Sequence, residues 1–434
     1  MNGEYVVAIG EQLRCVGTVR FGGLRQKQIS SFRYADDWIG SPSAFALAPS
    51  LPLSDQWFHF SGLPDDASTS IPGLFSDCAP DAWGRSIITR ASGLPQHEMG
   101  YVLAVDDRTR QGAMRFLDDE GNALANDVPP TPRTLELPRL QRLCQDIESG
   151  IGDLGAHARE LRGATASLGG ARPKSVVVDE KGTLHVAKFT MLGDTMPVER
   201  VEVATLSLAR DIGIRAAKAT LAMPDGALPV ALVERFDREP GEPGRRHYMS
   251  AQTLLEARRG EARFYTDIAD GLRAACRTDT DALTEMAELH RRILFTILVS
   301  NNDDHLKNHG LLYAGGGSWV LAPAFDINPQ PFRHRELKTG ISELSGFHAS
   351  VEAWVEAAPF FEQTEDGARR LAASMAEIIS ARWRGSLLAN GVTENQCDEY
   401  APAFEHEESR VALGMGSTSV PLADRDADRK KPSS

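Results

Sequence analysis

The sequence predicts an α+β protein with a two-lobed core preceded by a small β-rich N-terminal subdomain. The first hundred residues alternate in hydropathy and are rich in glycine, proline and aromatic residues, which is typical of short strands and turns. A strand hairpin and an amphipathic helix occupy the middle of the chain, and the pattern after residue 238 is mostly helical. Strands followed by helices favour the α+β class.

Composition bounds the kind of protein. The 434 residues are enough for two or three domains, and 42% apolar residues support a substantial core. The formal net charge of −13 argues against a surface dedicated to nucleic-acid phosphates, although a local basic patch remains open.

Strand patterns dominate the N-terminal part. Residues 4–22 alternate like two strands around a turn, and residues 32–38 (FRYADDW) resemble a third strand. A helix is expected over residues 79–91 (APDAWGRSIITRA). The proline-rich segment 127–138 marks the expected domain boundary.

The middle of the chain mixes helices and strands. Helical periodicity covers residues 137–150 and 197–214, and the second helix is expected to end near Gly213. Between them a loop (ATASLGGARPK) leads into a hairpin over 175–189 that turns at residues 179–182. An apolar strand is expected over residues 228–238.

Cysteine usage and the N-terminus indicate a cellular compartment. The five cysteines are scattered, odd in number and without a CxxC pair: Cys15, Cys78, Cys144, Cys276 and Cys397. This pattern favours free thiols in a reducing cytosol. The N-terminus has no apolar signal core, and no window approaches the ~20 apolar residues of a membrane span. We therefore expect a soluble, cytoplasmic protein with no membrane partner.

One loop and the segment after it carry the strongest chemical signal. VSNNDDHLKNHGLLY (299–313) contains Asp303 and Asn308, and LAPAFDINPQ (321–330) supplies Asp326 beyond an expected hairpin. An aspartate, an asparagine five residues later and a second aspartate after a hairpin is how protein-kinase-like enzymes hold a hydroxyl nucleophile and magnesium around ATP. Alone, Asp303 would be interpreted as a helix-terminating residue, and Asp326 equally well as a turn residue or as a metal ligand.

Magnesium prefers oxygen ligands shared between a few protein groups and the phosphates. Asn308 and Asp326 fit that role, and Asn328 can still offer a carbonyl oxygen. His305 and His309 are four residues apart but lack a third partner with convincing spacing, which argues against zinc. His305 then braces the catalytic loop or touches phosphate.

A lysine for the phosphates is expected at Lys188, which shares a strand face with Leu184 and Val186. Burying it would be costly without an acidic partner, and Glu202 on the following helix is the favoured one, with Glu199 as its competitor. The alternative is an edge-strand lysine that discourages aggregation.

The segment SLGGARPK (167–174) is a candidate phosphate loop, because two glycines allow close backbone approach and Arg172 and Lys174 add positive charge. No Walker motif is present. Pro173 removes one backbone N–H from this loop, and Asp304 would repel phosphate unless its carboxylate points away. Backbone groups of Glu234 and Phe236, in ERFDR, are candidates for reading an adenine edge.

In order along the chain, APDAWGR, SLGGARPK, VAKF, VERFDR, NNDDHLKN and AFDI resemble the HipA family of bacterial toxin–antitoxin serine/threonine kinases. The resemblance covers nearly the whole chain. It implies a HipA-like, protein-kinase-like fold with an N-terminal subdomain (1–130), a kinase N-lobe (131–238) and a helical C-lobe (239–415). The polar composition after Gly416 predicts a disordered tail (416–434). The core D-x-H-x-x-N is also similar to the loop of phosphatidylinositol kinases.

The resemblance also implies roles for individual residues. Asp303 would be the catalytic aspartate, assisted by Lys188 and His305; Asn308 and Asp326 would bind Mg2+; Glu202 would pair with Lys188; and Ser167 would be the inhibitory autophosphorylation site. The implied ATP-binding residues are Gly169, Gly170, Ala171, Arg172, Lys174, Lys188, Glu234, Arg235, Phe236, His305, Lys307, Asn308 and Asp326.

Family membership would make this chain a growth-arresting toxin that phosphorylates a translation component such as an aminoacyl-tRNA synthetase. Its implied partner is a HipB-like helix-turn-helix antitoxin, through which it would reach DNA only indirectly. Two other readings remain open from the residues: a small-molecule or lipid kinase, and a pseudokinase acting as a co-repressor through a DNA-binding partner.

Overall fold

The computed structural model describes residues 3–24, 27–125, 130–162, 170, 172–224, 226, 228–238, 244–332 and 335–417. Ser167, Gly169, Ala171 and the tail from residue 418 lie outside the described residues, as does part of the expected boundary at 127–138. No described helix is long and apolar enough to cross a membrane.

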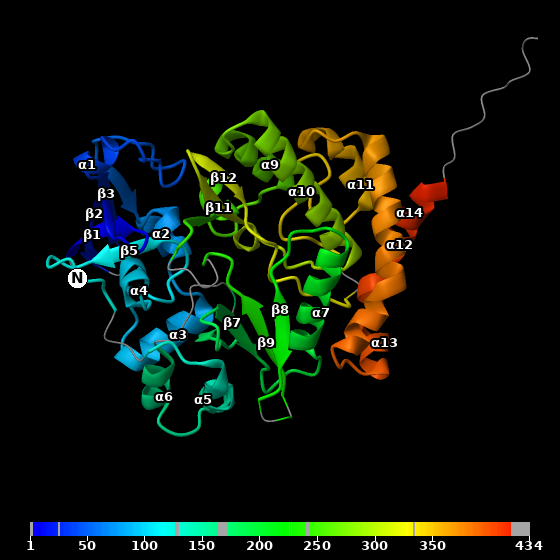
Figure 1. Cartoon of the computed structure of the whole chain (residues 1–434), viewed down its shortest axis with the longest axis horizontal. Coiled ribbons are helices and arrows are strands. Elements are labelled where there is room, and N and C mark those ends of the chain that lie inside the picture. The colour runs from blue at the N-terminus through cyan, green and yellow to red at the C-terminus, as the bar shows by residue number, and fades with distance from the viewer. Residues whose placement is uncertain are drawn as a thin grey trace, which may run out of the picture.

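A five-stranded antiparallel sheet forms the N-terminal subdomain, at the left in Figure 1, with strand order β4-β3-β2-β1-β5. Its elements are β1 (Gly3–Ile9), β2 (Arg14–Leu24), β3 (Lys27–Tyr34), α1 (Asp36–Ile39), β4 (Phe58–Ser61), α2 (Gly73–Asp77), α3 (Ala82–Ser92), α4 (Glu98–Ala104) and β5 (Met114–Leu117). The strands expected over 4–22 and the helix over 79–91 are present. The prediction of a third strand over residues 32–38 is wrong beyond Tyr34, because Asp36 and Asp37 begin a helical turn.

A four-stranded antiparallel sheet with order β6-β7-β9-β8 forms the second layer. Its strands are β6 (Lys174–Val178), β7 (Leu184–Phe189), β8 (Ala219–Ala222) and β9 (Val230–Glu234), and its helices are α5 (Leu137–Ser149), α6 (Leu154–Leu161) and α7 (Val198–Asp211). The predicted hairpin and both predicted helices are present, whereas the strand expected over 228–238 is shorter, because the chain turns after Glu234.

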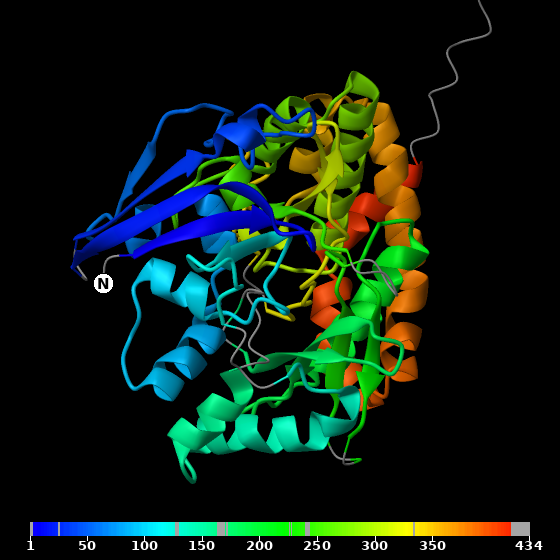
Figure 2. The same cartoon turned by 60° about the vertical axis from the view of Figure 1, so that its left-hand side comes forward.

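The period-two alternation along β7 sends its side chains to two cores. Ala187 and Phe189 pack with α5 and α6 in a small core that also includes Trp83 of α3, and Figure 2 shows these helices beneath the sheet. Val186 faces the main core, where Val201 of α7 packs. Lys188, two residues after Val186, therefore projects on the α7 side of the sheet.

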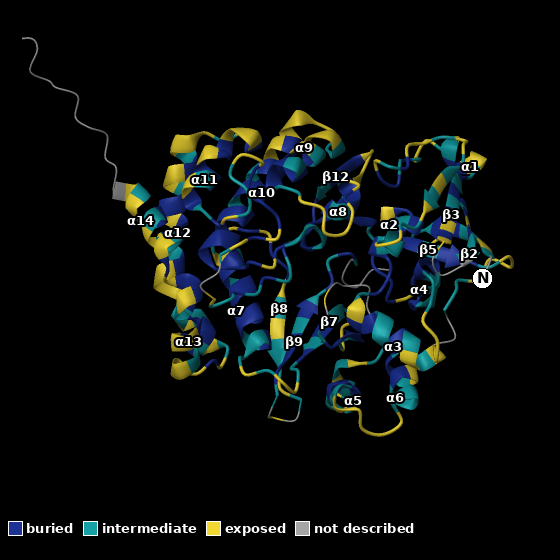
Figure 3. Ribbon diagram, turned by 180° about the vertical axis from the view of Figure 1, so that it is seen from behind, coloured by how far each residue is buried: buried dark blue, intermediate teal, exposed yellow. Residues whose placement is uncertain are grey.

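Helices make up most of the remaining chain, with a small β10-β11-β12 sheet at their edge. The elements are β10 (Tyr248–Ser250), α8 (Ala251–Leu254), α9 (Tyr265–Ala275), α10 (Asp279–Leu298), β11 (Gly310–Gly315), β12 (Ser318–Leu321), α11 (Val351–Glu356), α12 (Glu365–Ala389), α13 (Glu394–Phe404) and α14 (Glu407–Gly414). Figure 3 shows α10 largely buried in the interior, while α12 and α13 carry exposed residues on their outer side. The predicted α+β class is confirmed, and a central helix ends where the catalytic loop was expected.

Three buried histidines should make the fold sensitive to acid. Burial lowers the pKa of His247, His290 and His406 to about 4, from an ordinary value of 6.5. The unfolded chain therefore binds more protons than the folded chain between these values, so the free energy of unfolding should fall as pH drops from 6.5 towards 4.

His290→Gln should make that pH dependence shallower, because glutamine does not titrate. His290 stacks on Trp354 with ring centroids 4.0 Å apart, so the comparison is of slopes rather than of absolute stability. Urea unfolding at a series of pH values measures it, with exposed His348→Gln as the control. Equal slopes for wild type and His290→Gln would contradict the expectation.

Candidate active site

Lys188 joins three parts of the chain at one point. Its Nζ donates a hydrogen bond to Oε1 of Glu202 on α7 and another, 2.8 Å long, to Oδ1 of Asp326 beyond β12. β7 is an inner strand, which excludes the edge-strand interpretation of Lys188. Glu202, rather than Glu199, is the acidic partner, so the structure resolves the competition in favour of the first choice.

Lys188 and Asp326 each stabilise the ionised form of the other. Burial by itself would raise the pKa of Asp326, but Lys188 and then Lys174 outweigh it and hold that pKa at about 2. In the same way Asp326 and Glu202 overcome the effect of burial on Lys188 and raise its pKa. Asp326 is thus ionised at neutral pH, as a magnesium ligand must be.

Asp326 and Asn308 lie on the same cleft, as expected for a shared metal ion. Asp326 has φ +57°, in the left-handed region that aspartate and asparagine tolerate better than most residues. Nδ2 of Asn328 donates a 3.0 Å hydrogen bond to Oδ1 of Asp326. One carboxylate and one amide oxygen fit magnesium, which takes only a few protein ligands beside phosphate oxygens.

The two adjacent aspartates have opposite environments. Asp303 is exposed, and no described side chain bonds its carboxylate. Asp304 is buried, and its Oδ2 accepts hydrogen bonds from the Tyr265 hydroxyl (2.6 Å) and, at 3.0 Å, pairs with Nε2 of His309. These partners outweigh burial and lower the pKa of Asp304. Asp304 is therefore directed into the protein interior, the orientation in which its carboxylate would not repel a phosphate.

A cleft is lined by eight of the thirteen predicted ATP-binding residues, whereas Asp303 is not among its lining residues. Its apolar walls are cross-strand neighbours Val186 and Val233 together with Phe236 and Phe325, whose rings are 5.4 Å apart. Its remaining lining residues are Gln111, Lys174, Lys188, Glu234, Arg235, Asp237, Lys307, Asn308 and Asp326. Aromatic and branched apolar surfaces beside charged groups suit a base joined to phosphates.

At the expected adenine position, the backbone N–H groups of Glu234 and Arg235 already donate to Lys218 O (2.8 Å) and Leu184 O (2.9 Å). The Phe236 N–H has no acceptor among the described residues. Phe236 thus retains the backbone donor that a base edge requires, whereas Glu234 does not.

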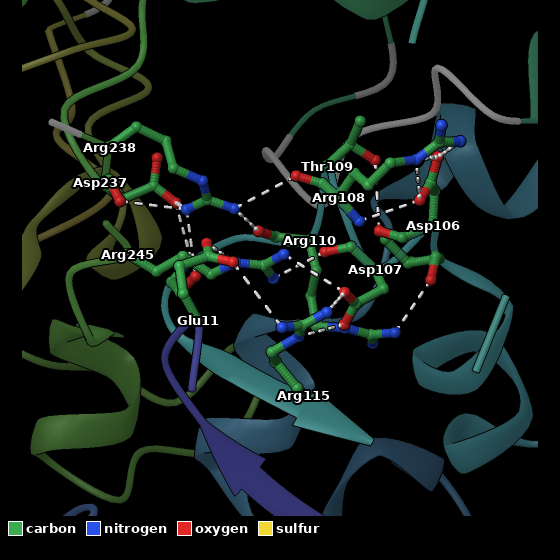
Figure 4. A network of polar contacts seen from close by, with 12 residues as sticks. Glu11, Asp106, Asp107, Arg108, Thr109, Arg110, Arg115, Asp237, Arg238 and Arg245 are labelled. Atoms are coloured by element: carbon green, nitrogen blue, oxygen red, sulfur yellow. Dashed lines mark hydrogen bonds and ion pairs between the residues drawn. The ribbon is translucent and has the colours of Figure 1, made fainter. Parts of the chain in front are cut away.

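The side chains of Arg235, Asp237 and Arg238 face the N-terminal subdomain. Asp237 accepts hydrogen bonds from Arg235, from Arg238 and from Gly112 N, the last 2.7 Å long. Figure 4 shows the wider network, in which Arg245 bonds Glu11 and Asp107. Arg235 lines the cleft, but its guanidinium is committed to Asp237 and to backbone carbonyls of the subdomain.

The candidate phosphate segment is only partly described. Arg172 forms ion pairs with Asp194 and, at 2.7 Å, with Glu199, and it is not among the residues lining the cleft. Lys174 does line the cleft. Gly170 has φ +112°, a conformation that favours glycine.

His305 and Lys307 belong to the same segment as Asn308. His305 does not line the cleft, but its ring lies close enough to contribute to the lowered pKa of Asp326. Lys307 lines this cleft and two adjoining hollows that extend towards the N-terminal subdomain.

Two contributors come from the N-terminal subdomain and were missed from the sequence. Gln111 lines the cleft, and Asp81 bonds Lys174 within it. The only sequence signal for Gln111 was VDDRTRQG, a polar run without strand or helix periodicity; Asp106, Asp107, Thr109 and Arg110 within it are completely buried. Asp81 belongs to APDAWGR, which was interpreted as a helix and as a motif of the N-terminal subdomain, but not as part of the site.

The fold and site define a two-lobed kinase-type protein with an added N-terminal subdomain. Family models match both halves of the chain: the HipA N-terminal domain over residues 13–117 and the HipA-like C-terminal domain over residues 166–383. The chain belongs to the HipA family, which confirms the inference from its motifs.

A solved HipA structure shares the fold of nearly the whole chain. HipA of Shewanella oneidensis MR-1, in a complex with HipB and operator DNA, is 17% identical with a TM-score of 0.67, covering 95% of this chain and 96% of that chain. The Helicobacter pylori proinflammatory kinase CtkA is 12% identical with a TM-score of 0.41, covering 58% and 95%. Comparison with curated protein sequences gave no match.

The contrast between the adjacent aspartates is testable. Asp304→Ala should lower the free energy of unfolding by about 3 kcal/mol, because it leaves the buried Tyr265 hydroxyl and His309 without their acceptor. Asp303→Ala should change it by less than about 0.5 kcal/mol, since its carboxylate is exposed. Urea unfolding of both variants measures the difference, and equal losses would show that the assignment of inward and outward aspartates is wrong.

Proposed function

We propose that this chain is an ATP- and magnesium-dependent protein serine/threonine kinase and the toxin of a HipBA-like toxin–antitoxin system. The observation that carries the proposal is the ion pairing of Lys188 with both Glu202 and Asp326. In kinase-type sites a lysine held by a helix glutamate binds phosphate, and an aspartate beside it binds the metal.

The nucleotide would occupy the cleft. Its base would pack between the apolar walls, with the Phe236 N–H available to its edge, and its phosphates would face Lys188, Lys174 and Lys307. Asn308 and Asp326 would hold Mg2+, which supplies charge neutralisation for the transferring phosphoryl group. Charge stabilisation and positioning account for most of the catalysis in this reaction class.

Asp303 would orient the substrate hydroxyl and accept its proton. The carboxylate is exposed and has no bond to another described side chain, so it is available to an incoming serine or threonine. Its neighbour Asp304 is occupied by Tyr265 and His309 and cannot substitute for it.

The partners follow from the family. The Shewanella HipA is solved with HipB and operator DNA, and we infer a HipB-like helix-turn-helix antitoxin for this chain as well. With a net charge of −13, the chain would approach DNA through that antitoxin. The proposed substrate is a translation component such as an aminoacyl-tRNA synthetase, reached in the cytoplasm.

Asp303→Ala should abolish phosphate transfer while leaving ATP binding and stability near wild type. Purified protein with labelled ATP and a cell lysate measures transfer, and calorimetry measures binding. Exposed Asp119→Ala is the matched control and should transfer phosphate normally.

Transfer by Asp303→Ala to any protein would overturn the assigned chemistry. Labelling of lipid extracts in place of proteins would point to a lipid kinase, and failure of the wild type to bind magnesium-ATP would point to a pseudokinase.

Inhibitory autophosphorylation at Ser167 is a separate part of the proposal. A phosphate there adds about two negative charges next to a loop meant to hold phosphates, so it should repel ATP. Ser167→Ala should lose the phosphate seen by mass spectrometry after incubation with ATP and remain active for longer, whereas Ser149→Ala should behave as wild type. Phosphate retained on Ser167→Ala would assign the modification to another residue.

A further inference from the structure

Two lysines of the cleft stand directly opposite each other. Lys174 on β6 and Lys188 on β7 are register partners in the antiparallel sheet, so their side chains leave the same face only about 5 Å apart. Like charges in that position destabilise a sheet unless acidic groups compensate them. Glu202 and Asp326 compensate Lys188.

The acid that compensates Lys174 comes from the N-terminal subdomain. Nζ of Lys174 lies 2.7 Å from Oδ2 of Asp81, and the two side chains are 4% and 5% exposed. The other carboxylate oxygen of Asp81 accepts from Gly84 N at 2.9 Å and caps α3. Nε1 of Trp83 donates to Lys174 O at 3.2 Å. The start of α3 therefore contacts this lysine at both its backbone carbonyl and its side-chain ammonium group.

The held ammonium group faces the nucleotide position. Lys174 lines the cleft beside Lys188 and Asp326, and it contributes to the lowered pKa of Asp326. A Cβ at Gly170 would lie 2.9 Å from its Nζ, so the head touches the glycine-containing segment. An ammonium has several N–H donors, and it can keep Asp81 on one while donating to phosphate with another.

We propose that Asp81 is a positioning residue for nucleotide phosphates, holding the Lys174 ammonium in the cleft so that the N-terminal subdomain completes the nucleotide site. The inference rests on the proposed kinase function. Without the carboxylate, a lysine this buried leaves the cleft or loses its charge. The arrangement repeats that of Lys188 and Glu202, with the acid supplied by another part of the chain.

Asp81→Asn tests the proposal because asparagine keeps the helix cap but removes the charge. Competition binding should show affinities for ATP and ADP reduced about tenfold with the affinity for adenosine unchanged, since Lys174 acts on phosphates alone. In transfer assays the KM for ATP should rise more than kcat falls. Lys174→Met should match Asp81→Asn, and the double variant should be no worse than either single variant.

Asp153→Asn is the matched control, because Asp153 caps α6 through Ala156 N without contacting a described lysine. Asp81→Glu, which restores the charge, should recover part of the ATP affinity. Unchanged or tighter ATP binding by Asp81→Asn would overturn the proposal, as would equal loss for ATP and adenosine. A wild-type protein that binds no magnesium-ATP would instead overturn the kinase function itself.

Discussion

The site depends on one buried lysine shared by two carboxylates. Lys188 bonds Glu202 on α7 and Asp326 beyond β12, so strand, helix and post-hairpin segment meet only when both lobes are in place. A lysine so enclosed would be unfavourable without those partners. The ion pairs form only when the two lobes have assembled, so the correct assembly of the lobes also arranges the site correctly.

The N-terminal subdomain is joined to this centre by charges rather than by apolar contact alone. Arg235 and Asp237 bond backbone groups of residues 109–112, and Arg245 reaches Glu11 and Asp107 (Figure 4). Most of these charges are buried, so separating the subdomain would leave them unpaired at considerable cost. Its position over the cleft is accordingly fixed, which allows Asp81 and Gln111 to belong to the site.

Local patterns predicted much of this arrangement. The spacing of Asn308 and Asp326 around a hairpin, and of Lys188 along its strand, depends on residues near in sequence. The sequence favoured Glu202 over Glu199 but did not exclude Glu199, because only the docking of α7 decides which of the two meets the lysine. The contribution of Asp81 to the site could not be predicted, because Asp81 lies 93 residues before Lys174 and their contact exists only through packing of the subdomain. The inward turn of Asp304 likewise depends on Tyr265, from a distant helix.

Charge balance connects the cleft to its proposed metal. Lys174, Lys188 and Lys307 carry the positive charge of the cleft, against the carboxylates of Asp81, Glu202 and Asp326. These three lysines and three carboxylates balance, so the protein groups alone give nucleotide phosphates little net attraction. Asp326 stays ionised because of its neighbouring lysines, and a divalent cation there would make the net charge positive. On the proposed function, magnesium dependence is thus a consequence of how the lysines are held, because each carboxylate that positions a lysine also neutralises part of that lysine's positive charge.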